Sequence, residues 1–293
     1  MSTVVVVGSV NVDLVAVGER MPLPGETVSM SHFTQEHGGK GANQAAAAVA
    51  LGAKTHLVGA VGDDHWGTVA RRQLADRGVR VEALTTVAGP TGTAIILVDG
   101  AGENSIAIVP GANAAVTPDL VTSALADVTG DAVVVACLEI PLDAVHAAAT
   151  AARTRGWRFV LNPAPAQPLP DSLLGLVSVL TPNQTEVSTL GGTESLLATG
   201  VEAVVVTHGG AGCTVHVAGA DPVPVPPCAA DVVDTTGAGD AFTAGLAVAL
   251  ADGQPLAAAV RWAAAAGAIA TEGLGAQGSL PTPPAVAARL ASG

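Results

Sequence analysis

The sequence is poor in positive charge, in cysteine and in long apolar segments, and each shortage excludes a class of protein. Its 293 residues include 12 lysines and arginines against 25 aspartates and glutamates, a formal net charge of −13. This balance argues against nucleic acid or an anionic membrane surface as a partner. Although 49% of the residues are apolar, glycine, proline and charge interrupt every run before the roughly 18 to 20 residues that a membrane-spanning helix needs. We therefore expect a soluble protein.

Cysteine is equally scarce. Cys137, Cys213 and Cys228 are far apart and lack the spacing of metal ligands, so buried free thiols are expected. The chain begins Met-Ser-Thr-Val and runs into a strand-like segment without the basic region of a signal peptide, which predicts a cytoplasmic location. We find no internal repeat and no long linker, and the length suits one large α/β domain with a small appendage, or two domains.

Strand and helix patterns alternate along most of the chain. β-Branched or apolar runs predict buried strands, at residues 3–8, 56–61, 132–137, 158–162, 177–181 and 203–207. Helical patterns lie between and after them, at residues 66–77, 142–155, 242–251 and 255–271. This order predicts a doubly wound, mostly parallel sheet flanked by helices. Two segments with strand and hairpin composition, at about 14–36 and 91–110, predict a small separate sheet able to act as a lid.

Polar residues follow nearly every predicted strand. They include Asn11, Asp13, Glu139, Asn162, Asn183, Glu186 and Thr207. Because the carboxyl ends of parallel strands meet at one edge of a sheet, this placement predicts a ligand-lined edge. Taken alone, Asn11 and Asp13 are equally well explained as Asx-turn residues.

The segment Asp234-Thr235-Thr236-Gly237-Ala238-Gly239-Asp240 has turn composition and precedes an apolar helix. Its Gly-Ala-Gly turn would place free backbone N–H groups at a helix start, which is a site for an anion. Asp240 beside that site would either cap the helix or take a proton from a hydroxyl that attacks a bound phosphate. The segment alone favours the cap.

A second glycine-rich segment, Gly38-Gly39-Lys40-Gly41-Ala42-Asn43-Gln44, precedes the helix predicted from residue 45. It lacks the glycine spacing and the terminal Lys-Ser/Thr of a P-loop. Backbone amides and a short amide side chain suit a polyhydroxylated ligand, because each can bond one hydroxyl.

Eight motifs in this order resemble those of the ribokinase group of the PfkB sugar-kinase family. They are Asn11-Val12-Asp13, Pro24-Gly25-Glu26-Thr27, residues 38–44, Gly100-Ala101-Gly102-Glu103-Asn104, Gly111-Ala112-Asn113, Asn162-Pro163-Ala164-Pro165, Thr181-Pro182-Asn183-Gln184-Thr185-Glu186 and residues 234–240. The resemblance implies one ribokinase-like α/β domain over residues 1–293 with the lid sheet described above. It also implies ATP-dependent phosphorylation of D-ribose at O5.

The resemblance further implies roles for single residues. Asp240 would be the general base, and the amides of Gly237, Ala238 and Gly239 the anion hole. Ribose would be bound by Asn11, Asp13, Gly39, Lys40, Gly41, Asn43, Glu139 and Asp240. ATP would be bound by Asn183 and Glu186, which would help to order Mg²⁺ and the phosphates, and by Gly239 and the loop Thr207, His208, Gly209, Gly210, Ala211 and Gly212.

A monovalent cation, usually K⁺, activates the kinases of this group. Its ligands by position would be Asp234, Thr236, Ala270, Gly273, Gly275 and Ser279, mostly through carbonyl oxygens. The alternative is that residues 273–278 form only a flexible turn.

Some features leave alternatives open. Ala264 stands where related kinases often carry Asn or His near the adenine, and residues 190–201 are shortened against the family. Another PfkB kinase, acting on deoxyribose, fructose, a sugar acid or a nucleoside, fits the same motifs. A non-catalytic sugar sensor is also considered, but sugar binding alone does not require Asp240. By resemblance we expect a homodimer through the small sheets, whose exposed edges would otherwise invite pairing.

Overall fold

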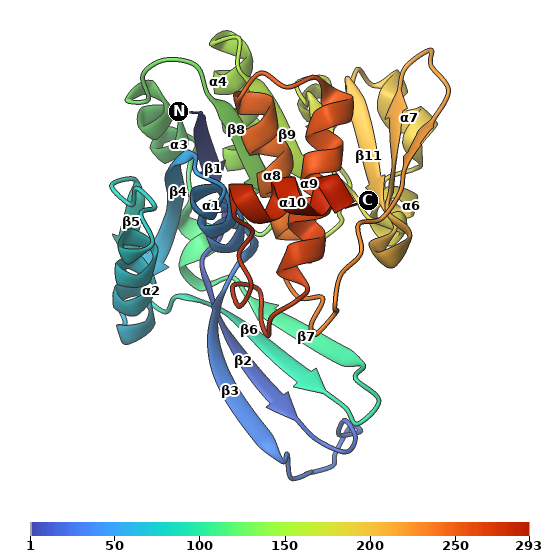
Figure 1. Cartoon of the computed structure of the whole chain (residues 1–293). Coiled ribbons are helices and arrows are strands. Elements are labelled where there is room, and N and C mark those ends of the chain that lie inside the picture. The colour runs from blue at the N-terminus through green and yellow to red at the C-terminus, as the bar shows by residue number, and fades with distance from the viewer. Residues whose placement is uncertain (1, 293) are drawn as a thin grey trace.

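The computed structural model contains two β-sheets. It describes residues 2–292, so the two end residues of the predicted 1–293 domain lie outside the described residues. Within this range nine strands form the large sheet, in the order β13-β12-β11-β10-β9-β8-β1-β4-β5, and four form the small one, in the order β3-β2-β6-β7. The small sheet projects from the main body, away from the helices (Figure 1).

The large sheet is parallel from β5 to β11 and antiparallel at its far edge. Its strands are β1 (Thr3–Val7), β4 (Lys54–Gly62), β5 (Leu84–Val87), β8 (Val133–Cys137), β9 (Arg158–Asn162), β10 (Val179–Leu180), β11 (Ala203–Thr207), β12 (Cys213–Val217) and β13 (Val223–Val225). The main helices are α1 (Lys40–Ala50), α2 (His65–Asp76), α3 (Pro118–Ala126), α4 (Leu142–Thr154), α8 (Ala238–Ala251), α9 (Leu256–Ala270) and α10 (Pro283–Ser292). Short helices α5 (Asp171–Leu174), α6 (Gln184–Thr189) and α7 (Thr193–Ala198) lie between β9 and β11.

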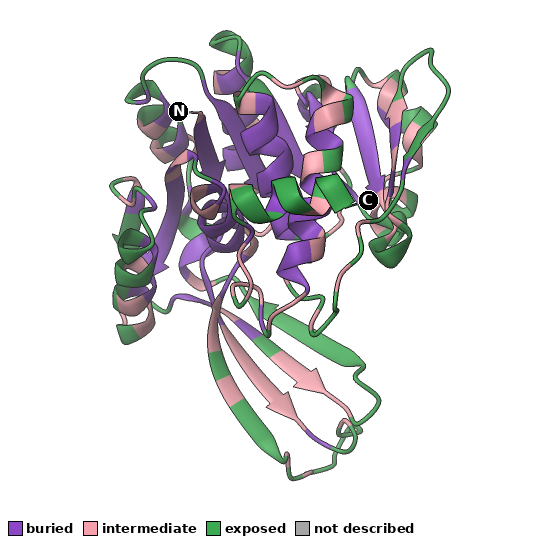
Figure 2. Cartoon of the chain, viewed as in Figure 1, coloured by how far each residue is buried: buried purple, intermediate pink, exposed green. Residues whose placement is uncertain are grey.

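Strand β1 shows why the sheet is covered on both faces. All five of its residues are buried (purple in Figure 2). Alternate side chains of a strand point to opposite faces, and Val4 and Val6 belong to the core shared with α1, α8 and α9, whereas Val5 and Val7 belong to the core shared with α3 and α4. β-Branched residues suit such a doubly covered strand. The predicted doubly wound α/β fold is confirmed.

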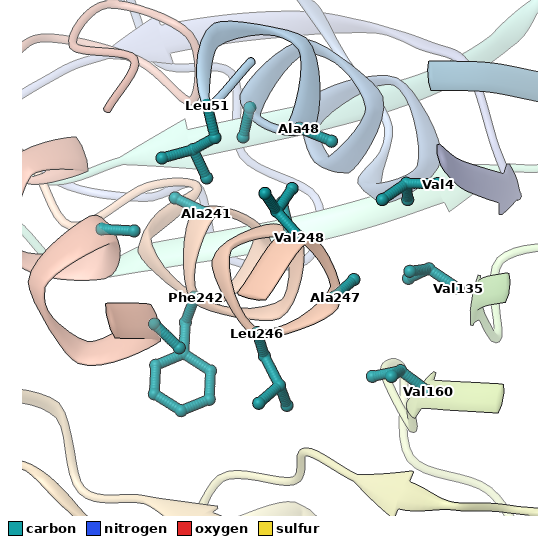
Figure 3. Close-up of a cluster of buried hydrophobic side chains, with 14 of the residues drawn as sticks. Val4, Ala48, Leu51, Val135, Val160, Ala241, Phe242, Leu246, Ala247 and Val248 are labelled. Carbon is teal, nitrogen blue, oxygen red and sulfur yellow. The ribbon is translucent and has the colours of Figure 1, made fainter. Parts of the chain in front are cut away.

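Helix α8 lies at the centre of one of these two cores. Every residue from Asp240 to Leu250 is buried, and Figure 3 shows Val248 directed toward Ala48 of α1 and Ala247 toward Val135 of β8. An added Cβ at Gly245 would lie 2.9 Å from the Cβ of Ala266, so the glycine allows α8 and α9 to approach closely. Packing on all sides fixes the position of the N-terminus of α8.

The small sheet consists of β2 (Asn11–Val17), β3 (His32–Gly38), β6 (Gly92–Val98) and β7 (Asn104–Val109). β2 pairs in parallel with β6, and the two outer pairs are antiparallel. Asn11 and Asp13 lie on β2, at the base of this sheet, so the Asx-turn explanation is wrong for both. Strand β2 begins at Asn11, three residues before the start predicted for the small sheet near residue 14, because only a short segment separates it from β1.

Helix starts and edge strands differ most from the sequence expectation. Helix α1 begins at Lys40 and α8 at Ala238, four to five residues earlier than their alanine-rich patterns indicate. Glycine is typical of turns, so the sequence pattern does not indicate these first helical turns. The structure requires glycine there because both helices begin against other backbone segments. Strands β12 and β13 were not expected and extend β11 as an antiparallel edge. Among residues 2–292, no helix is both long and apolar enough to cross a membrane.

Candidate functional site

A cavity of about 810 Å³ opens beside the N-terminus of α8. Its walls come from five parts of the fold: the start of α1, the start of α8, one side of α9, the loops that follow the carboxyl ends of β9, β10 and β11, and the segment 227–232 after β13. The polar residues in these walls are Lys40, Asn162, Thr181, Asn183, Glu186, Thr207, Thr235, Asp240 and Thr271. Segments far apart in sequence thus meet at the edge of the sheet predicted to bind a ligand.

The predicted anion site is the turn before α8. Gly237 is the N-cap of the helix, with φ at 78° in the left-handed region, and an added Cβ would lie 2.7 Å from the Cα of Ala276. Only glycine fits there. The amide of Ala238 donates to the carbonyl of Thr235 at 3.2 Å, whereas the described backbone offers no acceptor to the amides of Gly237 and Gly239. The latter two amides are the better candidates for an anion hole.

Asp240 is the third residue of α8, and therefore it does not cap the helix. It lies in the cavity wall and is 7% exposed. Its Oδ1 accepts a hydrogen bond from Nε2 of Gln44, and its Oδ2 accepts one from Nδ2 of Asn43, each at 3.0 Å. Burial raises the pKa of Asp240 and Glu139 adds to this rise, whereas Lys40 and the two amides oppose it. A carboxylate of raised pKa is a stronger proton acceptor.

Side chains from the segments that follow β1 and β8, from β2 and from the 3₁₀ turn Gly111–Ala115 form one hydrogen-bond network. Glu139 Oε2 accepts from Ser9 Oγ at 2.5 Å, from the backbone N of Lys40 at 3.1 Å and from Asn11 Nδ2 at 3.4 Å. Asn11 Oδ1 accepts from Asn113 Nδ2 at 2.7 Å. The network orders the polar groups at the junction between β1 and the small sheet.

Asp13 carries an unsatisfied acceptor in this region. Its Oδ1 is buried and has no partner within residues 2–292. Burial, followed by the charges of Glu139, Glu36 and Asp240, raises its pKa to about 7, against a smaller opposing effect of Lys40. A Cβ at Gly38, on the neighbouring strand, would clash with the carboxylate. A ligand hydroxyl could satisfy this oxygen.

The glycines of the second motif bring these groups together. Gly39 has φ at 87°, and an added Cβ would lie 2.6 Å from the backbone N of Asn11. At Gly41 it would lie 2.5 Å from the backbone N of Ser9. The first turn of α1 can therefore contact the junction of β1 and β2 directly, and both glycines have a structural role whether or not they also contact a ligand.

The carboxylate of Asp234 connects the two segments of the predicted cation site, residues 234–236 and the loop that contains Gly275. Asp234 Oδ1 accepts from the backbone N and the Oγ1 of Thr236, at 2.9 and 2.7 Å, and its Oδ2 accepts from the backbone N of Gly275 at 2.8 Å. Burial raises the pKa of Asp234, but these hydrogen bonds outweigh it and the net pKa is lowered. Gly273 packs against Ser279, since an added Cβ would lie 2.9 Å from the Cβ of Ser279. The described residues hold no cluster of three or more His, Cys, Asp or Glu side chains that suits a metal.

On the opposite wall, Asn183 and Glu186 form a capping box at the start of α6. Asn183 N donates to Glu186 Oε2 at 2.7 Å, and Glu186 N donates to Asn183 Oδ1 at 2.8 Å. Both residues also line the cavity, together with Thr207, Gly209, Gly210 and Gly212. His208 and Ala211, predicted for the same loop, are not in the cavity wall. His208 Nε2 instead lies 2.9 Å from the Oγ1 of Thr214.

Four polar residues that hydrogen-bond within the site had no predicted role. They are Ser9, Gln44, Asn113 and Gln277, whose Nε2 donates to Asn43 Oδ1 at 3.0 Å. The last three lie within or beside glycine-containing motifs, which is the only signal the sequence offers for them. Their pairing depends on contacts across up to 234 residues of chain, which spacing cannot reveal.

Comparisons relate the chain to sugar kinases. A profile described as pfkB family carbohydrate kinase matches residues 1–283. The ribokinase of Bacillus subtilis (strain 168) is 39% identical over 286 residues, which cover 96% of this chain and 97% of that protein. The ribokinase structure from Thermotoga maritima superposes with a TM-score of 0.89 at 32% identity, covering 99% and 100% of the two chains. The ribokinase of Arabidopsis thaliana, solved in complex with ribose and ATP, gives 0.88 at 34% identity, covering 99% and 98%.

Replacement of Asp13 tests the electrostatics of this site. Because the folded-state pKa of about 7 exceeds the ordinary value of 3.8, the folded protein binds this proton more tightly. The contribution of Asp13 to stability is therefore fully present below its ordinary pKa of 3.8 and is lost as the pH rises through about 7. Asp13→Asn removes this loss, so we expect it to raise the free energy of unfolding at pH 8 by on the order of 1–3 kcal/mol, and much less at pH 4.5.

Urea denaturation at the two pH values measures the effect. Asp221→Asn, at an exposed loop position, is the matched control and should show no pH-dependent gain. An equal effect of Asp13→Asn at both pH values would show that the charge of Asp13 is not the cause.

Proposed function

Because the chain belongs to the PfkB family of carbohydrate kinases, we propose that it transfers the γ-phosphoryl group of ATP to O5 of D-ribose and yields D-ribose 5-phosphate. The observation that carries this proposal is the buried carboxylate of Asp240 beside the unpaired amides of the α8 turn, in the wall of a large cavity. The identity of the sugar and nucleotide is supported by the ribokinase relatives and by the plant ribokinase solved with ribose and ATP.

In the transfer step, Asp240 accepts the proton of the O5 hydroxyl as O5 attacks the γ-phosphorus. The O5–P bond forms while the bond from the γ-phosphorus to the β,γ-bridging oxygen breaks, and ADP leaves with that electron pair. The amides of Gly237 and Gly239 and the N-terminal end of the α8 dipole stabilise charge on the transferred group. Phosphoryl transfer requires mainly such positioning and charge stabilisation.

Lys40 supplies the positive charge at the junction of the two substrates. Its burial lowers the pKa of the ammonium group, but Asp240 and Glu139 outweigh this effect and the net pKa is raised. Lys40 therefore stays charged in the cavity wall. In a chain of net charge −13, a local cation of this kind is needed to hold an anionic phosphate chain.

The ribose would be held by Asn11, Asp13, Asn43 and Glu139, with the backbone of residues 39–41. These groups offer both donors and acceptors, as a polyol requires. The strongest support for ribose binding here is Oδ1 of Asp13, which is buried and has no hydrogen-bond partner among the described residues. An unsatisfied buried acceptor destabilises the fold unless a ligand hydroxyl reaches it.

The cavity fits Mg²⁺ with its nucleotide. Glu186 borders the cavity and uses only Oε2 in the capping box, which leaves Oε1 for a metal-bound water, and Asn183 offers a neighbouring amide. Mg²⁺ favours a few carboxylate and phosphate oxygens with retained waters. When bound, the ion would neutralise charge on the β- and γ-phosphates.

For the monovalent cation, the support is the joined pair of loops around Asp234. Its carboxylate oxygens are already used to connect residues 236 and 275, so a cation would rely on carbonyl oxygens, from Asp234, Thr236, Ala270, Gly273, Gly275 and Ser279. Such an ion would stabilise the loop that positions the Gly237 turn.

We also propose that two copies pair through their small sheets and that the protein acts in the cytoplasm. Apolar side chains of the small sheet are exposed, with Phe33 at 55%, Ile106 at 54% and Val109 at 48%, and a partner would cover them. The cytoplasmic location is supported by the three free cysteines, since free thiols persist in reducing compartments.

Asp240→Asn tests the catalytic assignment. We expect kcat for ribose to fall by roughly 10³-fold or more, because the amide cannot accept the proton, while ribose still binds in calorimetry. With the unmodified protein, a panel of ribose, 2-deoxyribose, fructose and adenosine should give ribose the highest kcat/KM.

The outcomes separate the candidate functions. Retained turnover in Asp240→Asn would overturn the general-base role. A higher kcat/KM for another panel member would identify a different PfkB kinase, and ribose binding without any turnover in the unmodified protein would identify a sugar sensor. Asp252→Asn, an exposed change at the other end of α8, serves as the control and should leave kcat unchanged.

The cation site predicts an ion-dependent rate. Replacing K⁺ by Na⁺ at constant ionic strength should lower kcat severalfold, because the smaller ion fits a carbonyl cage less well. Asp234→Asn should weaken this dependence on the ion. The side chain of Asn has one acceptor oxygen and one donor nitrogen, so it cannot accept the Thr236 hydrogen bonds on one atom and the Gly275 hydrogen bond on the other. Equal rates in the two salts would show that the proposed monovalent-cation site does not affect catalysis.

A further inference from the structure

Two side-chain amides from the first turns of α1 hold the carboxylate of Asp240. Asn43 donates to one oxygen and Gln44 to the other, both at 3.0 Å. With one amide donor on each oxygen, the orientation of the carboxylate is fixed relative to α1. Asn43 is also a proposed ribose ligand, whereas Gln44 has no role in the function proposed above.

The orientation of the Gln44 amide is determined by its neighbours. The side chain is fully buried at 0% exposure. Besides its bond to Asp240, Nε2 donates to Asn162 Oδ1 at 3.4 Å, and Asn162 Nδ2 donates to the carbonyl of Thr181 at 3.4 Å. A reversed amide would place the Gln44 carbonyl oxygen against a carboxylate and a second acceptor. The nitrogen therefore has to face Asp240.

The other end of this amide is unfavourable for folding. Oε1 of Gln44 is buried and finds no partner among residues 2–292. An unsatisfied buried carbonyl destabilises a protein, and the adjoining positions of α1, residues 45–48, are buried alanines. An apolar side chain would suit this position better if packing were its only task.

We propose that Gln44 is a positioning residue for the phosphoryl transfer, which holds the ionised carboxylate of Asp240 in the orientation that faces the cavity. This inference rests on the proposed function, because it assigns Gln44 a task only if Asp240 is the base. A donor to the charged form of an acid favours that form. Gln44 thus opposes the effect of burial and keeps Asp240 available to accept a proton near neutral pH.

Gln44→Met tests this role, since methionine keeps the length of the side chain and removes both polar atoms. We expect kcat to fall about 10- to 100-fold, the loss typical of one hydrogen bond to a charged group, with little change in KM for ribose or ATP. The acid limb of the kcat–pH profile should move up by about one pH unit. The Tm should change little, because the loss of a donor to Asp240 and the removal of the unsatisfied Oε1 have opposite effects on stability.

A purely structural role predicts the opposite pattern, a lower Tm with the acid limb unmoved, and that result would overturn the proposal. Gln73→Met, at an exposed position of α2, is the matched control and should change none of these quantities. Gln44→Asn is the second variant if methionine prevents folding. It keeps an amide but withdraws it by one methylene, and the acid limb should again move up.

The failure of this inference differs from the failure of the proposed function. If Asp240→Asn keeps its turnover, the proposed function fails. If Asp240→Asn loses turnover but both Gln44 variants keep the kcat and the acid limb of the unmodified protein, Asp240 remains the base and only the role of Gln44 is wrong.

Discussion

A buried carboxylate lies at the positive end of a helix that is itself fixed on every side. Asp240 is in the first turn of α8, and the ten residues after it are buried between the sheet, α1 and α9. The helix cannot shift without disturbing the core, so the carboxylate and the turn at Gly237 keep a constant relation. Burial raises the pKa of Asp240 while Lys40, Asn43 and Gln44 limit the rise. A carboxylate of raised pKa is a better proton acceptor.

The same constraint explains why glycine recurs around the site. Gly41 lets α1 begin against the backbone of Ser9, and Gly237 lets α8 begin against Ala276. The first approach brings the N-terminus of α1 to the junction where the chain passes from β1 to β2, and the second places the turn before α8 against the loop of residues 273–279. Asp240 lies between the two sets of candidates, because the sugar-binding candidate Asn43 donates to its carboxylate and the candidate anion-hole residues Gly237 and Gly239 directly precede it at the start of α8. The proposed transfer between a sugar and a nucleotide requires such proximity.

The sequence predicts the layers of the fold well, because β-branched strands such as Thr3–Val7 and the alanine-rich helices have clear periodicity. It predicts the helix starts less well. Glycine at residues 39, 41 and 237 indicates a turn in the sequence, whereas in the structure it allows close packing against other backbone segments. The motif residues Asn43 and Asp240 were found, but the bond between them and the role of Gln44 depend on contacts across almost 200 residues. No local pattern encodes those contacts. Strands β12 and β13 were missed because they are only five and three residues long and the second contains Pro224.

In the proposed transfer, Asp240 and the amides before it face the two reacting atoms at once. The most direct measurement is a crystal structure with ribose and a non-hydrolysable ATP analogue. We expect O5 of ribose within about 2.6–3.2 Å of an Asp240 carboxylate oxygen, with the γ-phosphate at the amides of Gly237 and Gly239. An O5 hydroxyl turned away from Asp240, or a γ-phosphate bound elsewhere in the cavity, would contradict it.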